Sequence, residues 1–275
     1  MSATTLRGAR YARMFERLDR AAEGAFVPFL MLGDPDPARS LAAVRALARA
    51  GADALELGLP FSDPIADGPV IQAAATRALA AGVHRSDCWE IVSSVRAEFP
   101  VLPIGLLVYA NLVCHHDPAE FYRAAAAAGV DSVLVADLPV LEAGPVAAAA
   151  RELGVAPVFI APPNADPARL RAIADASEGY TYVTSREGVT GADQRLRRDL
   201  SGLIARLREL GAPPPILGFG IANPEQVRAA LAMGAAGAIS GSAVVKLVAE
   251  GGDVEGFVRA MKDATTQRRK DAKDC

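Results

Sequence analysis

The chain alternates between two hydrophobic patterns, one with helical spacing and one made of short continuous apolar runs. Residues 11–23 place apolar side chains at helical spacing, which predicts an amphipathic helix ahead of the main fold. Residues 25–32 follow as an apolar run between glycines, which predicts a buried strand. The chain therefore enters its core with a helix and then a strand.

One unit then recurs along the sequence: a helical segment, a glycine and a short apolar strand. Each glycine fits the left-handed position that closes a helix. Segments 103–109 and 179–184 fill the gaps, so the pattern predicts eight strands that alternate with helices. The repeats are A-R-A-G-A-D-A-L-E-L from Ala48, A-A-A-G-V-D-S-V-L-V from Ala126, R-E-L-G-V-A-P-V-F-I from Arg151, R-E-L-G-A-P-P-P-I-L from Arg208 and L-A-M-G-A-A-G-A-I-S from Leu231.

Strict alternation of strand and helix over this length predicts a parallel sheet with helices outside it. Eight units in a chain of 275 residues fit a closed (β/α)8 TIM barrel. We expect residues 1–275 to form a single domain, with frayed tails at 1–10 and 267–275. An open doubly wound sheet is the alternative, but no G-x-G-x-x-G follows the first strand.

Composition narrows the class of protein. The chain is 51% hydrophobic and has a net charge of -3 without a basic stripe, which argues against nucleic acid as the main partner. Its three cysteines have no disulfide or zinc spacing, and the histidines have no carboxylate at metal spacing, so no metal site is predicted. No signal core or membrane span is visible, so we expect a cytoplasmic protein.

The stretch from Ala54 to Gln72 holds the best candidate chemistry. It begins as a strand that contains Glu56 and passes into a loop that contains Asp67. Strand alternation puts Glu56 on the face with small residues, which suits the barrel interior, and active sites of this fold lie at the carboxyl ends of strands. Burial should raise the pKa of Glu56, whereas Asp67 in a polar loop should stay ionised. A structural buried acid paired with a cation is the alternative reading of Glu56.

Two further features point to a ligand. Residues 218–221 and 239–242 combine small residues with helix starts after the last two strands, where this fold often binds phosphate. The segment 185–195 carries two glycines and is either a mobile lid or an ordinary surface loop. Aromatic residues are scarce, and four of them fall in or at the ends of strands, where they could line an apolar pocket: Phe29, Tyr109, Tyr182 and Phe219.

The stretch L-E-L-G-L-P-F-S-D-P-I-A-D-G-P-V-I-Q resembles the signature of the tryptophan synthase alpha subunit family. The resemblance extends from about Tyr11 to about Met261 through G-A-F-V-P-F, I-G-L-L-V-Y-A-N-L-V, G-V-D-S-V-L-V-A-D-L-P, A-P-P-N-A-D, G-Y-T-Y-V-T-S-R-E-G-V-T-G, G-F-G-I and G-A-I-S-G-S-A. It implies retro-aldol cleavage of indole-3-glycerol phosphate to indole and D-glyceraldehyde 3-phosphate. It also implies an alpha2-beta2 complex, in which a beta subunit holds pyridoxal phosphate and joins indole to serine. No cofactor is implied for this chain.

The resemblance also implies residue roles. Glu56 would be the acid/base, Asp67 would meet the indole N–H, and Thr190 would close onto Asp67. The loops around residues 63–64 and 137–139 are the expected contacts with the partner. The implied indole pocket consists of Phe29, Leu107, Tyr109, Ala136, Ile160, Tyr182 and Phe219. Backbone groups of Gly191, Gly220, Gly241 and Ser242 would hold the phosphate.

Two rival functions remain open on the sequence. A different phosphate-handling barrel enzyme, such as an isomerase or indole-glycerol-phosphate synthase, is one, although a strand-borne lysine expected in the latter is missing. A subunit that mainly binds and regulates its partner is the other. The presence of both Glu56 and Asp67 counts against that second alternative.

Overall fold

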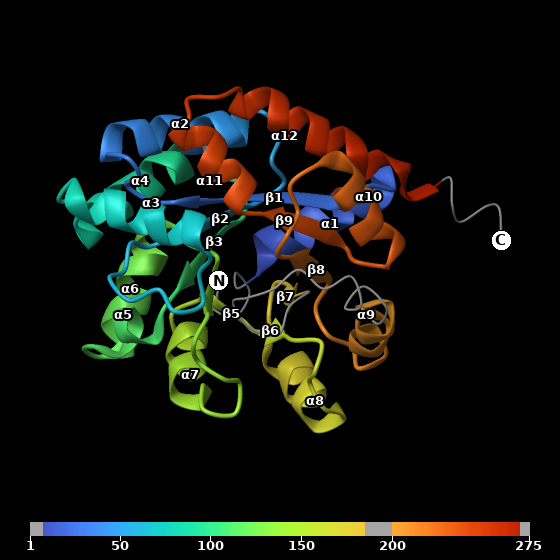
Figure 1. Cartoon of the computed structure of the whole chain (residues 1–275). Coiled ribbons are helices and arrows are strands. Elements are labelled where there is room, and N and C mark those ends of the chain that lie inside the picture. The colour runs from blue at the N-terminus through green and yellow to red at the C-terminus, as the bar shows by residue number, and fades with distance from the viewer. Residues whose placement is uncertain (1–7, 185–199, 270–275) are drawn as a thin grey trace.

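Parallel strands form the centre of the molecule and helices surround them (Figure 1). The computed structural model describes residues 8–184 and 200–269. In this part of the chain the strands follow the order β5-β4-β3-β2-β1-β9-β8-β7-β6. The strands are β1 Ala25–Met31, β2 Leu55–Gly58, β3 Ile104–Val108, β4 Ser132–Val135, β5 Ala156–Val158, β6 Ile160–Ala161, β7 Thr181–Thr184, β8 Pro215–Gly218 and β9 Gly237–Ser240. The predicted parallel (β/α)8 barrel is confirmed.

The barrel differs from the prediction at the strand expected within residues 155–160. This strand is split at Phe159 into β5, which pairs with β4, and β6, which pairs with β7. The ladder continues across the split, because the Tyr182 N–H donates to the Phe159 carbonyl over 3.1 Å. One strand thus serves two neighbours in succession, which explains nine strand segments where eight strands were predicted.

The helices begin where the sequence supplies a cap. Aspartate or asparagine side chains accept a backbone N–H at the starts of α2, α6, α8, α10 and α12. Proline often follows at the first helical position, where no N–H is needed. The helices are α1 Ala9–Ala21, α2 Pro37–Arg49, α3 Pro69–Ala80, α4 Arg85–Glu98, α5 Ala110–Cys114, α6 Pro118–Ala128, α7 Gly144–Glu152, α8 Pro167–Ala176, α9 Leu200–Glu209, α10 Pro224–Ala232, α11 Ser242–Ala249, α12 Val254–Asp263 and the 3-10 helix η3 Ala264–Arg269.

Helix α1 lies across the amino-terminal ends of the strands, opposite the carboxyl ends that the sequence analysis favours for a site. Asp53, just before β2, accepts hydrogen bonds from Arg17 of α1 (2.7 Å), from Lys262 of α12 (2.7 Å) and from the Phe26 N–H (2.9 Å). Asp53 is almost fully buried. Its carboxylate therefore ties α1 and α12 to the start of the sheet.

Asp131 repeats this arrangement two strands further along. It precedes β4 and accepts hydrogen bonds from Arg10 of α1 (2.7 Å), from Arg96 of α4 (2.6 Å) and from the Ile104 N–H (2.8 Å). Both aspartates follow the glycine of a repeated unit, in G-A-D and in G-V-D. The sequence repeat thus places two equivalent carboxylates that hold α1 against the end of the barrel.

The chain ends are described in part. Residues 9–10 and 267–269 belong to the first and last helical segments, while 1–7 and 270–275 lie outside the described residues. The single domain stays a prediction. Among residues 8–184 and 200–269, no helix combines the length and apolar character that crossing a membrane requires.

Candidate active site

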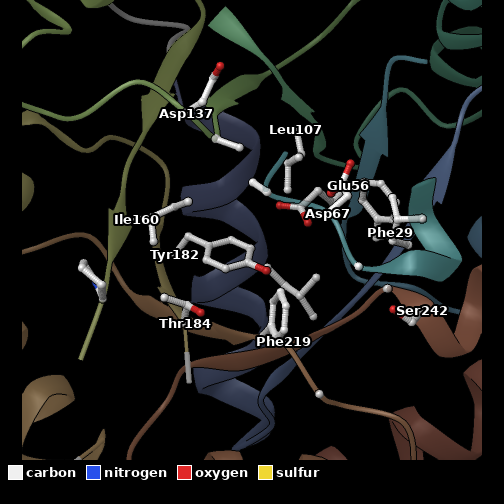
Figure 2. A pocket seen from close by; sticks show the side chains of 18 of the residues that line it. Phe29, Glu56, Asp67, Leu107, Asp137, Ile160, Tyr182, Thr184, Phe219 and Ser242 are labelled. Atoms are coloured by element: carbon white, nitrogen blue, oxygen red, sulfur yellow. The ribbon is translucent and has the colours of Figure 1, made fainter. Parts of the chain in front are cut away.

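A cavity of about 800 Å³ opens at the carboxyl ends of the barrel strands. Strand residues and the loops that follow them form its walls, and Figure 2 shows the side chains of Glu56 and Asp67 directed into the same space. Most of the predicted site residues that the structure describes lie in its lining. These are Phe29, Glu56, Asp67, Leu107, Ala136, Ile160, Tyr182, Phe219, Gly220, Gly241 and Ser242.

Glu56 lies on β2 with its side chain inside the barrel, as strand alternation predicted. It pairs in register with Phe29 of β1 and with Gly105 of β3, and it is only 1% exposed. Its pKa is raised to about 7, chiefly by desolvation and in smaller part by the charge of the nearby Asp67 carboxylate. A carboxylic acid with a pKa near neutrality can both give and take a proton at physiological pH.

Tyr180 supports Glu56, and the sequence analysis did not identify it. Its hydroxyl donates to Glu56 Oε1 over 2.8 Å, and this bond opposes the rise in the pKa of Glu56 because it stabilises the charged form. Tyr180 is buried and lies two residues before Tyr182. Alternation along a strand puts both tyrosines on one face, so the signal for Tyr180 was present.

Helix α1 packs against Tyr180, the partner of Glu56, from the amino-terminal end of the barrel. The Tyr11 ring of α1 lies 5.3 Å from the Tyr180 ring, centroid to centroid, and the Tyr11 hydroxyl hydrogen-bonds with Ser132 of β4 over 2.9 Å. Gly105 leaves room for this contact, because a Cβ there would lie 2.9 Å from the Tyr11 hydroxyl and 2.7 Å from the Ser132 oxygen. Packing at the closed end of the barrel therefore fixes the tyrosine that contacts Glu56.

Asp67 lies in the loop between β2 and α3 and is more enclosed than a polar loop suggested. Burial raises its pKa to about 6, while a hydrogen bond with Tyr109 opposes the rise. Asp67 is thus mainly ionised at pH 7, as expected, but it becomes protonated at a higher pH than an exposed aspartate. The sequence could not show that Tyr109 and the cavity would enclose it.

Tyr109 is not part of the cavity lining, although it was predicted for the pocket. Its hydroxyl accepts the Ala66 N–H over 3.1 Å, and its ring stacks on Phe61 with centroids 5.3 Å apart. Both contacts hold the loop that carries Asp67. Tyr109 therefore positions the loop from behind instead of forming the wall.

Another part of the wall is formed by tight turns after β8 and β9. Phe219 and Gly220 both have positive φ angles, 77° and 80°, and the Tyr182 ring packs so closely on Gly218 that a Cβ would lie 2.1 Å from its hydroxyl. Gly241 precedes α11, which begins at Ser242. Backbone N–H groups at a helix start attract anions, so this wall suits a phosphate.

Some predicted residues cannot be placed, and other residues were not predicted. Thr190, Gly191 and the whole segment 185–195 lie outside the described residues. The cavity lining also includes groups that were not predicted as binding residues: Asn164, Arg169 and Thr184. Within the described part of the chain, no cluster of three or more His, Cys, Asp or Glu residues could hold a metal ion.

The chain is similar in sequence to known proteins over nearly its whole length. The family model described as tryptophan synthase alpha chain matches residues 15–273. A tryptophan synthase alpha chain of Shewanella amazonensis is 55% identical over 264 residues, which is 93% of this chain and 99% of that protein. One of Aeromonas hydrophila is 58% identical over 239 residues, covering 87% of this chain and 89% of the relative.

Solved structures share the fold. A chain from Aquifex aeolicus has a TM-score of 0.86 at 33% identity and covers 93% of this chain and 98% of its own length. Tryptophan synthase from Mycobacterium tuberculosis gives 0.85 at 30% identity, with coverage of 94% and 98%. A chain from the tryptophan synthase a2b2 complex of Pyrococcus furiosus gives 0.79 at 36% identity, with coverage of 87% and 98%.

The buried Glu56 predicts a stability that depends on pH. Its folded-state pKa of about 7 lies above the ordinary value of 4.5, so the folded protein holds the proton more tightly than the unfolded chain. Wild-type stability should therefore fall as pH rises from about 4.5 to about 7, by up to roughly 3 kcal/mol. Glu56→Gln does not titrate, so it should gain stability relative to wild type across this window.

Urea unfolding of both proteins between pH 4 and pH 8 measures this difference. The exposed Glu142 supplies a matched control, because Glu142→Gln removes the same charge at the surface. A difference between Glu56→Gln and wild type that stays constant with pH would show that the Glu56 carboxyl titrates normally.

Proposed function

The chain belongs to the tryptophan synthase alpha chain family, and we propose that Glu56 and Asp67 perform its chemistry at the mouth of the barrel. As a member of this family it is a lyase, which cleaves indole-3-glycerol phosphate to indole and D-glyceraldehyde 3-phosphate in L-tryptophan biosynthesis. One observation carries the residue assignment: a buried glutamate with a pKa of about 7 shares an apolar cavity with a second carboxylate.

The reaction requires two proton movements around one carbon–carbon bond. Cleavage between indole C3 and the glycerol carbon needs a proton delivered to C3. It also needs a proton removed from the hydroxyl group of that glycerol carbon, which becomes the aldehyde. The two movements balance, so a single group that exchanges protons near neutrality can serve both, and Glu56 has the required pKa.

Asp67 acts through its charge in this proposal. Protonation at C3 leaves positive charge on the indole ring, and a carboxylate next to the ring N–H stabilises that charge. Tyr109 holds Asp67 in place and favours its ionised form. The two carboxylates thus divide the work, because one gives and takes protons while the other remains charged.

The remaining lining residues position the substrate. The apolar side chains of Phe29, Leu107 and Ile160 suit an indole ring. Backbone groups at Gly220, Gly241 and Ser242 suit the phosphate, which then serves as the handle that orients the bond to be broken. Thr190 and Gly191 keep their proposed roles in closing the site and binding phosphate.

Cofactor and partner follow the same family assignment. Glu56 accounts for both proton transfers and Asp67 for the charge stabilisation, so we propose that this chain uses no cofactor and that pyridoxal phosphate belongs to a beta subunit. A cytoplasmic location stays part of this proposal. The proposed alpha2-beta2 contact involves the loops at 60–64 and 137–139, beside which Ile65 is 68% and Leu141 is 79% exposed.

The rival functions lose support. Indole-glycerol-phosphate synthase would be expected to carry a lysine in a barrel strand, and none of the strands described above contains one. A purely regulatory subunit would not need a buried acid with a pKa near neutrality in its cavity.

The first test of the residue roles is activity. Glu56→Gln and Asp67→Asn should each lower the rate of indole release from indole-3-glycerol phosphate by about 10²-fold or more. Glu209→Gln, a change at an exposed position of α9, should leave the rate unchanged. Near-wild-type turnover in Glu56→Gln would refute the acid/base role, and retained activity in Asp67→Asn would reduce Asp67 to a structural residue.

The second test concerns Tyr180 and uses the pH profile. The Tyr180 hydroxyl lowers the pKa of Glu56, so Tyr180→Phe should move the pH inflection due to Glu56 upward and reduce kcat about tenfold. Tyr122→Phe removes a hydroxyl from another buried tyrosine, on α6, and serves as the control. An unshifted inflection in Tyr180→Phe would mean that the bond does not tune Glu56.

The third test concerns the partner. Size-exclusion chromatography with the beta subunit should give a shared peak, and Leu141→Asp should weaken it because a charge replaces an exposed apolar contact. Val101→Asp makes the same change at a 72% exposed position before β3, at the other end of the barrel, and should have no effect. Equal effects of the two variants, or no shared peak with the wild-type chain, would contradict the proposed surface.

A further inference from the structure

We propose that Arg169 attracts the phosphate group of the substrate into the cavity and so lowers the KM for phosphorylated ligands. The inference rests on the proposed function, because it takes a phosphate ester as the ligand. No sequence motif singled out Arg169, and it is not part of the glycine-rich wall proposed for the phosphate. It would act in addition to that wall, from the first turn of α8.

Arg169 is held at the mouth by the start of α8. Asp166 caps this helix by accepting the Arg169 N–H over 2.8 Å, and α8 follows β6, so its first turn lies at the carboxyl ends of the strands. Side chains of a helix lean toward its amino terminus, which here means toward the cavity. Arg169 accordingly lies in the lining beside Asn164 and Pro162.

The charges around the cavity are unbalanced without Arg169. Among the lining residues that the structure describes, Glu56, Asp67 and Asp137 carry carboxyl groups, while Arg169 supplies the cation. A phosphate monoester carries a charge of about -1.5 to -2 at pH 7. Such a ligand would be repelled by the acidic side chains of the cavity as it enters, and a cation at the mouth offsets this repulsion.

Arg169 is also available for this role. It is half-buried, and within the described ranges no ion pair joins its guanidinium to an acidic side chain. Arg171, two residues later on the same helix, differs in this respect. It lies 3.8 Å from Asp175 and donates to the Leu210 carbonyl over 3.3 Å, away from the cavity lining. Comparing the two arginines therefore distinguishes the effect of a positive charge at the cavity from that of a positive charge on the outer surface of the helix.

The effect should depend on charge and on salt. One unit charge acting on a dianion in a solvated cavity should change KM about threefold to tenfold at low ionic strength. Because the Debye length shrinks to about 3 Å at 1 M salt, added salt should reduce the change. The value of kcat should hardly change, because Arg169 acts on substrate binding and takes no part in the proton transfers.

The experiment compares Arg169→Gln, Arg169→Lys and Arg171→Gln in the isolated full-length chain. The reverse reaction separates a charged ligand from a neutral one at the same site. We expect Arg169→Gln to raise the KM for glyceraldehyde 3-phosphate at low salt while the KM for indole stays constant. Arg169→Lys should keep the wild-type KM, and Arg171→Gln should match wild type.

Several results would overturn the inference. Equal rises in both KM values would indicate a distorted cavity, and a defect of the same size in Arg171→Gln or Arg169→Lys would exclude a local charge effect. The same assay is repeated with the beta subunit added, and a defect that appears only in that arm would assign Arg169 to the partner contact. Turnover of the wild-type chain tests the proposed function independently. If the wild-type chain releases indole and Arg169→Gln has the same kinetic constants, the role of Arg169 is refuted and the proposed function is not.

Discussion

The site depends on one constraint: a carboxylic acid must be kept inside the barrel, next to a tyrosine hydroxyl, without being forced fully to either charge state. Burial alone would favour the neutral form of Glu56, and the hydrogen bond from Tyr180 favours the charged form. The balance leaves a pKa near neutrality. The strand register beside Gly105, the packing of Tyr11 and the loop with Asp67 all contribute to this environment.

Much of the architecture was predictable because its signals are local. Helix caps, closing glycines and the period-two pattern of β2 each depend on a few neighbouring residues, and together they gave the barrel and the inward direction of Glu56. The split at Phe159 was not predictable in this way. It arises because one strand must pair with two different neighbours, which is a property of closure and not of the sequence near residue 159.

The site shows the same division. Residues on strand faces, such as Phe29 and Tyr182, were expected in the cavity and lie there. The predictions for Tyr109 and Asp67 rested on the sequence segment around each residue. Their environments depend instead on the contact between the end of β3, which carries Tyr109, and the loop after β2, which carries Asp67. Tyr180 was not predicted because active-site residues of this fold are expected at the carboxyl ends of strands, whereas Tyr180 precedes β7 and contacts Glu56 from the amino-terminal side of the barrel.

Helix α1 has a consequence beyond the packing of Tyr11. By covering the closed end of the barrel, and by being held there through Asp53 and Asp131, it keeps water away from the underside of Glu56. Helix α1 thus helps to maintain the low-dielectric environment of Glu56, whose side chain is accessible to a ligand from the cavity. The proton chemistry at the mouth consequently depends on α1, although no residue of α1 is among those that line the described cavity.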